Sequence, residues 1–276
     1  MYRGNFLQLN MLGVSCRFFS TSRKSPDRSN LIYRGIFLLN IEILKSKPNL
    51  YRARRLLNFL RQSSIINPEI DRQRVSDLYE FEREAYSSGF DLIAGVDEAG
   101  RGCLAGSLAV GACILPREIY IPRLDDSKKL SPKLREKIYD EIRAAAIAWS
   151  VVFIDEKRID EINILEATRE GMKLAISKLN PQPQMILTDF VKLENSRVPT
   201  KSIVHGDARS ASIAAASILA KVERDRLMQS LDSKFPEYHF AKNKGYGTKD
   251  HIEAIEKFGA CEIHRKTFAP IKFLPN

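Results

Sequence analysis

Acidic residues follow short apolar runs at three separate places in the 276-residue chain. They are Asp97 with Glu98, Asp189, and Asp207. Acids are rarely buried unless something pairs with them, and neighbouring strand ends would bring these groups together. Clustered carboxylates repel one another and are pushed towards protonation unless cations neutralise them. Oxygen-only clusters suit hard divalent ions such as Mg²⁺ or Mn²⁺, and a pair of ions about 4 Å apart supports phosphodiester hydrolysis.

Each acid also has a plainer interpretation. A single aspartate at the end of a strand is commonly a turn former or a helix cap, and this applies to Asp189 and to Asp207. Successive residues of a strand point to opposite faces of its sheet. Asp97 and Glu98 therefore share one site only if the strand ends or bends between them.

The glycines after the first acids offer a rival function. Gly100, Gly102 and Ala105 spell GxGxxA after a predicted strand, a partial match to the dinucleotide-binding fingerprint. In that fingerprint the turn leads into a helix that cradles a pyrophosphate. Here the neighbouring carboxylates would repel a diphosphate, and residues 107–115 have the composition of a strand. Both observations disfavour a dinucleotide site.

The elements that position these residues alternate between strands and helices. Apolar runs predict strands at Leu92–Val96, Leu108–Leu115, Trp149–Ile154, Met185–Thr188 and Ser202–Val204. Helical periodicity predicts helices at Pro132–Ala148, Asn163–Leu179 and Ser210–Leu231, with Ser131 as the N-cap of the first. This alternation favours an α/β fold in which a mixed sheet is covered by helices.

Composition divides the chain into three predicted regions. Residues 1–30 form a basic leader, residues 31–90 a helical appendage, and residues 91–276 the main domain. Residues 1–90 carry 15 Lys and Arg against 8 Asp and Glu, whereas residues 91–276 carry 29 against 26. The basic excess indicates either a polyanionic partner or simply a basic leader joined to a nearly neutral domain. Two stretches of the appendage, Tyr51–Leu60 and Val75–Tyr86, have helical spacing.

The N-terminal composition and the cysteine spacing bear on where the protein is located. The first 26 residues contain no Asp or Glu. This composition fits an organelle transit peptide, a disordered basic tail, or an upstream start with Met11 as another initiator. The four cysteines lack zinc-site spacing, which favours a reducing compartment. No apolar run approaches the roughly 18 residues that span a bilayer, so we expect no membrane helix.

Several ordered motifs resemble those of bacterial-type ribonuclease HII, the type 2 ribonuclease H, from about Ile93 to Pro270. The matching segments are IAGVDEAGRG at 93–102, DSKKL at 126–130, NILEAT at 163–168, Gly206-Asp207, SIAAASILAKVERD at 212–225, KGYGT at 244–248, and His264-Arg265 before Phe268. The chain departs from the family pattern at Cys103 and Ser107, where proline is usual, at Phe190, where glycine is usual, and at Asn243, where histidine is common.

The resemblance implies an RNase H-like mixed sheet flanked by helices, with a small C-terminal helical part and the basic N-terminal extension. It implies a monomer that cleaves the RNA strand of RNA–DNA hybrids and incises 5′ of single ribonucleotides in duplex DNA, with Mn²⁺ or Mg²⁺ as cofactor. The family's four acidic metal ligands fall on Asp97, Glu98, Asp189 and Asp207. Its junction-reading residues fall on Gly100, Arg101, Gly102 and Tyr246. A cytoplasmic location follows from the bacterial family, or a mitochondrial or plastid one if the leader is a transit peptide.

A hybrid-binding protein that has lost cleavage is the alternative from another functional class. Loss of any one of the four acids would favour it, and the sequence retains all of them.

Overall fold

The structure is a computed structural model that describes residues 6–11, 14–19 and 67–274. The chain divides into two compact units, Met1–Ile66 and Asn67–Asn276. In the first unit, strands β1 (Phe6–Met11) and β2 (Val14–Phe19) pair in antiparallel register, although composition predicted no strand there. The predicted helix at residues 51–60 lies outside the described residues.

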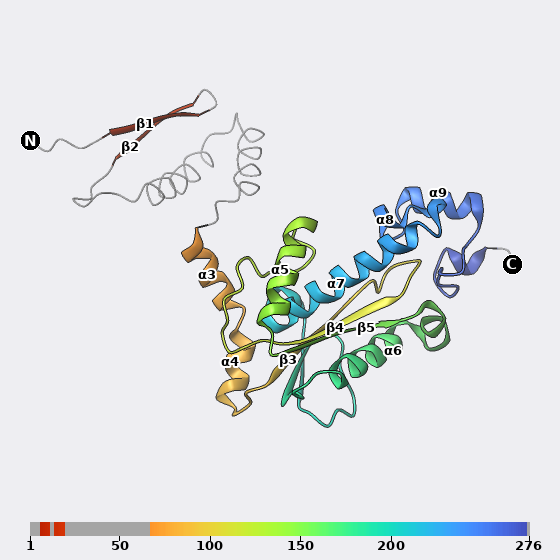
Figure 1. Ribbon diagram of the computed structural model, residues 1–276, viewed down its shortest axis with the longest axis horizontal. Helices are drawn as coiled ribbons and strands as arrows, with labels where there is room; N and C mark the ends of the chain where they lie inside the picture. The colour runs from red at the N-terminus through yellow and green to blue at the C-terminus, as the bar shows by residue number, and fades with distance from the viewer. Residues whose placement is uncertain (1–5, 12–13, 20–66, 275–276) are drawn as a thin grey trace, which may run out of the picture. The chain divides into compact units, whose positions relative to one another are not determined.

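A five-stranded mixed sheet forms the centre of the second unit (Figure 1). Its strands are β3 (Ile93–Ala99), β4 (Leu108–Ile114), β5 (Ala148–Ile154), β6 (Met185–Asp189) and β7 (Thr200–Ile203). They lie in the order β5-β4-β3-β6-β7, with β4 antiparallel to both of its neighbours and β3, β6 and β7 parallel. The alternation read from the sequence is therefore confirmed as a mixed α/β sheet.

Helices cover both faces of this sheet. The helices of the unit are α3 (Pro68–Asp77), α4 (Glu80–Ser87), α5 (Pro132–Ala145), α6 (Glu156–Ser177), α7 (Ala211–Asp232), α8 (Phe240–Asn243) and α9 (Lys249–Phe258), with short 3₁₀ turns η2 (Gly206–Ala208), η3 (Pro236–Tyr238) and η4 (Ile271–Phe273). Helices α5 and α7 pack on one face, where Cys113 is buried, and α6 packs on the other, where Val110 and Ile114 are buried. Figure 1 shows α6 and α7 on opposite sides of the strands.

Caps and close packing explain why these helices form where they do. The Ser131 side chain accepts the N–H of Leu134 at the start of α5, as predicted. Asn163, the predicted start of the second helix, is a left-handed break inside α6 with φ 67°, and its side chain caps the part that follows. Helix α7 comes so close to β3 that a Cβ on Gly95 would lie 2.0 Å from the Ser212 carbonyl carbon. Only glycine allows this approach.

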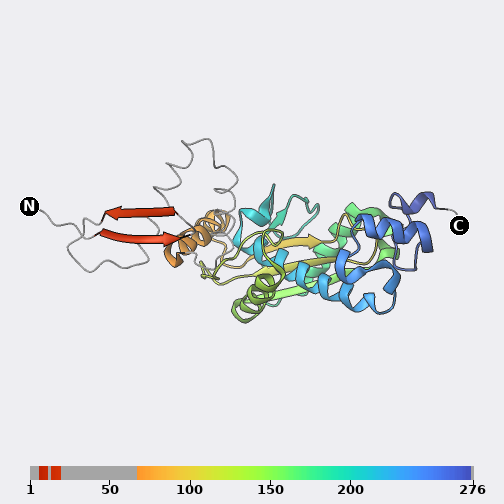
Figure 2. The same cartoon turned by 90° about the horizontal axis from the view of Figure 1, so that it is seen from above.

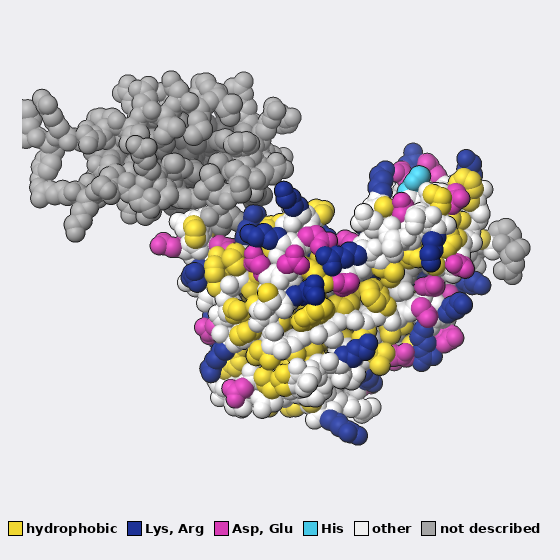
Figure 3. Space-filling model, in the orientation of Figure 1, with side chains coloured by type: hydrophobic (Ala, Val, Ile, Leu, Met, Phe, Trp, Pro, Cys, Tyr) yellow, Lys and Arg dark blue, Asp and Glu magenta, His cyan; other side chains and the backbone are white. Residues whose placement is uncertain are grey.

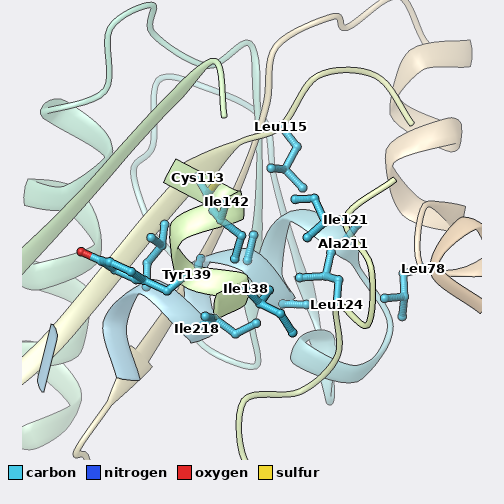
Figure 4. Packing of buried hydrophobic residues seen from close by; sticks show 14 of the residues in the cluster. Leu78, Cys113, Leu115, Ile121, Leu124, Ile138, Tyr139, Ile142, Ala211 and Ile218 are labelled. Atoms are coloured by element: carbon cyan, nitrogen blue, oxygen red, sulfur yellow. The ribbon is translucent and has the colours of Figure 1, made fainter. Parts of the chain in front are cut away.

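Helices α3 and α4 belong to the same compact unit as the sheet. Val75, Leu78 and Tyr79 are buried in one apolar cluster with Ile142 of α5 and Ile218 of α7 (Figure 4). The sequence assigned this segment to an appendage ending at residue 90. The compact unit instead begins at Asn67 because these side chains, spaced three and four apart, form one apolar face that the core covers.

The C-terminal helical part packs against the far end of α7. Met228 of α7 shares a buried cluster with Tyr238, Phe240 and Ile255. Figure 2 shows α8, α9 and the C-terminal turns, in blue, gathered beside that end of the helix. Leu104 from the turn after β3 is buried in the same cluster, so the C-terminal part is attached to the loop that carries the glycine-arginine-glycine sequence.

Charge is mixed over the visible face of this unit. Figure 3 shows Lys and Arg side chains interspersed with Asp and Glu, with apolar side chains between them. This face therefore shows no single basic patch, in keeping with the nearly equal numbers of basic and acidic residues in 91–276. In the described part of the chain, no helix is both long enough and apolar enough to span a membrane.

Candidate active site

Three of the four predicted acids meet at one edge of the sheet. Oxygen atoms of Asp97, Asp189 and Asp207 all lie within 4.8 Å of one another. Asp97 lies in β3 and Asp189 ends β6, the parallel neighbour in which Thr188 pairs with Val96. Asp207 comes from η2, which follows β7. The carboxyl ends of parallel neighbours coincide, so the topology brings the acids together.

Glu98 lies beside this group and is not part of it. Strand β3 continues to Ala99, so the alternation that buries Asp97 on the α7 face turns Glu98 towards the α6 face. One carboxylate oxygen of Glu98 lies 3.6 Å from an Arg101 nitrogen, and its Oε2 is buried without a hydrogen-bond partner. Glu98 therefore keeps acceptor capacity for a further partner.

Burial and crowding disfavour the charged forms of these acids. The pKa of Asp97 is raised well above its ordinary value by burial, and then by the negative charges of Glu98 and Asp189. Burial raises the pKa of Glu98 to about 7, although the Arg101 guanidinium opposes the shift. The pKa of Asp189 is also raised by burial, against a 2.7 Å hydrogen bond from the Gly206 N–H.

The acid group fits a divalent cation. Its donors are carboxylate oxygens only, the set that Mg²⁺ and Mn²⁺ prefer. Asp97 is 4% exposed, and its charge has no neighbouring cation in an ion pair among the described residues. A bound ion would neutralise the carboxylate charges whose repulsion adds to burial in raising the pKa of Asp97.

Two residues at this site were not singled out from the sequence. The Lys128 ammonium lies 2.9 Å from Oδ2 of Asp207. Partial burial lowers the pKa of Lys128, but the hydrogen bond and charge of Asp207 outweigh it and raise the pKa overall. The Ser217 hydroxyl of α7 lies 3.0 Å from the hydroxyl of Ser127, and Ser217 opposes the rise in the pKa of Asp97. Lys128 belongs to the DSKKL motif and Ser217 to the SIAAASILAKVERD motif. These two motifs were the features of the sequence that could have pointed to both residues.

The glycine-arginine turn and Tyr246 lie next to each other. The Leu104 N–H donates to the Gly245 carbonyl at 2.8 Å, which joins the loop after β3 to the KGYGT loop. The Tyr246 ring is 40% exposed, and the Lys221 ammonium lies 5.5 Å from its centre. Burial raises the pKa of Tyr246 to about 12, so its hydroxyl is neutral at physiological pH. An exposed aromatic ring and an arginine thus lie on neighbouring loops, and the arginine lies next to Glu98.

After Gly102 the chain forms a short loop and then strand β4, Leu108–Ile114. A dinucleotide-binding turn would lead into a helix instead. The rival interpretation of the glycines is therefore wrong.

Comparison with known proteins identifies the family. The family model of ribonuclease HII matches residues 94–271. The chain belongs to the ribonuclease HII family. It is 52% identical over 200 residues to the ribonuclease HII of Acetivibrio thermocellus, covering 72% of this chain and 78% of that protein. It is 46% identical over 214 residues to that of Caldanaerobacter subterraneus subsp. tengcongensis, covering 77% and 89%. Ribonucleases HII are endoribonucleases, so the protein is a hydrolase of this class.

Solved structures agree with this fold. The crystal structure of the ribonuclease H2 from Pyrococcus horikoshii OT3 is 28% identical to the chain, with a TM-score of 0.56, and the match covers 66% of this chain and 96% of that one. The ribonuclease HII in the PCNA complex from Archaeoglobus fulgidus is 28% identical, with a TM-score of 0.55, and the match covers 64% and 95%. The predicted RNase H-like sheet flanked by helices is thereby confirmed.

Proposed function

We propose that this protein cleaves the RNA strand of RNA–DNA hybrids and incises 5′ of single ribonucleotides in duplex DNA, leaving 3′-hydroxyl and 5′-phosphate ends. The observation that carries the proposal is the meeting of Asp97, Asp189 and Asp207 within 4.8 Å. Family membership supports action on RNA paired with DNA.

In this proposal the acids hold two divalent ions, Mg²⁺ or Mn²⁺. Asp97, Asp189 and Asp207 would supply carboxylate oxygens, and we further propose that Glu98 would join them through its unpartnered Oε2. When bound, the ions activate a water and stabilise the leaving oxygen. The Gly206 N–H donates to Asp189 and so fixes the orientation of that carboxylate, and the Glu98 N–H does the same for Asp97 at 2.8 Å.

Recognition of the ribose falls to the neighbouring loops. Gly100, Arg101 and Gly102 present a guanidinium and backbone groups beside the acids. These contact the 2′-hydroxyl and the phosphate, and Tyr246 packs its exposed ring against the adjacent sugar. The 2′-hydroxyl distinguishes RNA from DNA, so this contact selects the site of cleavage. We also propose that the protein acts as a monomer.

A direct test incubates the protein with a DNA duplex that contains one ribonucleotide, in Mg²⁺ and separately in Mn²⁺. We expect a single cut 5′ of the ribonucleotide, with the product ends mapped by ligation and phosphatase treatment. An all-DNA duplex of the same sequence is the matched control and stays intact. An intact ribonucleotide duplex under both metals would refute the proposal, and tight binding of that duplex without a cut would favour the hybrid-binding alternative.

A further inference from the structure

Two arginines are fully buried between the C-terminal part and the loop after β3. Arg224 of α7 and Arg265, which follows α9, are each 0% exposed. Within residues 67–274 neither forms an ion pair with an Asp or Glu, in contrast to Arg135, which pairs with Asp225. Burying an unpaired guanidinium is unfavourable unless its donors are satisfied. The two side chains therefore must obtain compensation elsewhere.

Backbone carbonyls supply that compensation. Arg265 donates to the Gly106 carbonyl through Nε at 3.1 Å and Nη2 at 2.7 Å, and to the Arg101 carbonyl through Nη1 at 3.0 Å. Its own N–H donates to the Leu104 carbonyl at 2.8 Å. Arg265 thus holds both ends of the loop that begins with the proposed ribose-reading turn.

Arg224 joins this loop to the one that carries Tyr246. It donates to the Ser107 carbonyl at 3.0 Å and the Ala105 carbonyl at 3.2 Å, and its third bond, at 2.8 Å, reaches the Lys244 carbonyl. Lys244 precedes Tyr246 by two residues. This guanidinium, together with the Leu104–Gly245 backbone hydrogen bond, therefore fixes the separation of the two recognition loops.

Gly100 makes room for this arginine. It has φ 94°, and a Cβ there would lie 1.9 Å from Nε of Arg224. Gly100 is thus required by the buried Arg224 guanidinium behind the turn, independently of any contact that the turn makes with substrate.

We propose that Arg224 and Arg265 are positioning residues that hold the Gly100–Gly102 turn and the Tyr246 loop in one fixed arrangement for recognition of the ribose. This inference rests on the proposed function. Through a planar fork of donors, Arg265 spans the carbonyls of two residues and Arg224 those of three. Lysine donates from one nitrogen and lacks the planar fork of separate nitrogens, so an Arg→Lys change keeps the charge and loses this geometry.

The test measures discrimination between ribose and deoxyribose. Binding is compared for a DNA duplex with one ribonucleotide and an all-DNA duplex of the same sequence, using full-length protein in the Asp97→Asn background to prevent cleavage. We expect Arg224→Lys and Arg265→Lys each to lower the ratio of the two affinities about tenfold or more, because small displacements of positioning groups have large effects. Affinity for the all-DNA duplex should change little.

Ile142→Ala is the control for lost stability. Ile142 is buried in the cluster between α5 and the sheet, so its truncation destabilises the fold without touching either loop. Its affinity ratio should equal that of the parent. Should a lysine variant fail to fold by circular dichroism, Arg224→Met and Arg265→Met replace it, since they remove the buried charge together with the donors.

The outcomes separate the two proposals. A parent protein that binds both duplexes equally overturns ribose recognition by these loops, and the inference with it. A parent that discriminates, with folded arginine variants that discriminate equally well, overturns the positioning role alone. A ratio that falls equally in Ile142→Ala also overturns it, because general loss of stability would then account for the effect.

Discussion

The ammonium nitrogen of Lys128 lies 2.9 Å from Oδ2 of Asp207, inside the group of acids proposed to hold the metal ions. The Asp207 side chain is 6% exposed and that of Lys128 is 74% exposed. The Asp207 carboxylate is held in place by its burial, whereas the exposed Lys128 side chain can swing out into solvent. In the protein without metal, this lysine supplies part of the positive charge that the cluster lacks.

Replacing Lys128 with glutamine should tighten the binding of divalent ions. An ion that coordinates Asp207 displaces the ammonium, and the variant has no such pair to break. Because Lys128 is largely exposed, the pair is worth at most about 1 kcal/mol, so we expect a gain in affinity of about two- to fivefold. Isothermal titration calorimetry with Mn²⁺ measures this directly. Lys129→Gln is the matched control, since Lys129 pairs with Asp125 and not with the acid group; an equal gain there would contradict a specific role for Lys128.

Asp97→Asn should abolish cleavage and stabilise the protein in the absence of metal. Because the pKa of Asp97 is raised in the folded protein, this residue favours folding most at pH values below its ordinary pKa. That contribution to the free energy of unfolding is lost as the pH rises and the buried carboxyl must ionise. Near pH 7, asparagine removes the cost of a carboxylate charge that is buried and repelled by Glu98 and Asp189, and we expect the free energy of unfolding to rise. Activity should fall by at least about 100-fold, since even indirect loss of ligand support costs 10- to 100-fold.

Metal titration separates these two effects of Asp97. Excess Mn²⁺ at about 100 times its dissociation constant should stabilise the wild type by about 2.7 kcal/mol and the variant much less. Chemical denaturation with and without Mn²⁺ measures both values. A variant that cleaves at the wild-type rate, or that gains as much from Mn²⁺, would remove Asp97 from the metal site.

The sequence predicted the acid group because the geometry that forms it is simple. Apolar runs ending in Asp97 and Asp189 became parallel neighbours, whose carboxyl ends necessarily coincide. Glu98 was less predictable because its side of the sheet depends on where β3 ends, and β3 continues past it. Lys128 lies in an aperiodic loop, where residue spacing indicates no direction for a side chain.

Buried polar residues account for the rest of what the sequence did not show. Arginine is a residue type that usually lies at the surface. Arg224 and Arg265 are buried because carbonyls of the surrounding loops accept their hydrogen bonds. Glu82 is similar: it is 1% exposed and accepts hydrogen bonds from Ser210 and from both Ser212 donors at the start of α7. Helix α4 was placed in an appendage because this long-range cap is invisible to local periodicity.

Phe190→Gly should stabilise the fold. Phe190 follows Asp189 with φ 55°, a left-handed conformation that is costly for a bulky residue, and its side chain is 61% exposed. Its backbone is held by hydrogen bonds to Ile203 and Ser202. Relief of strain, less the entropy cost of glycine, should raise the free energy of unfolding by about 0.5–1 kcal/mol in urea denaturation. Phe190→Ala keeps the strain and is the control; equal effects of glycine and alanine would contradict the explanation.

Two buried histidines form a neutral pair behind the Tyr246 loop. The Nε2 atoms of His251 and His264 are 3.1 Å apart. Nδ1 of His251 lies 2.9 Å from the Tyr246 carbonyl and donates to it, so its Nε2 is free to accept from His264. Nδ1 of His264 then accepts the N–H of Cys261 at 2.9 Å. Burial lowers the pKa of both rings, and the neighbouring His251 helps to lower that of His264 to about 4.

Acidification should therefore destabilise the wild type more than a His264→Gln variant. Above pH 6.5 the ring is neutral in both folded and unfolded protein, and its full contribution is present. Between pH 6.5 and about 4 the unfolded chain binds a proton that the folded protein excludes, so stability falls by about 3 kcal/mol in total. Urea denaturation of both proteins from pH 7.5 to 4.5 measures this, and their difference cancels the opposite contribution of the acid group. Parallel pH curves for the two proteins would show that His264 is not held neutral by the fold.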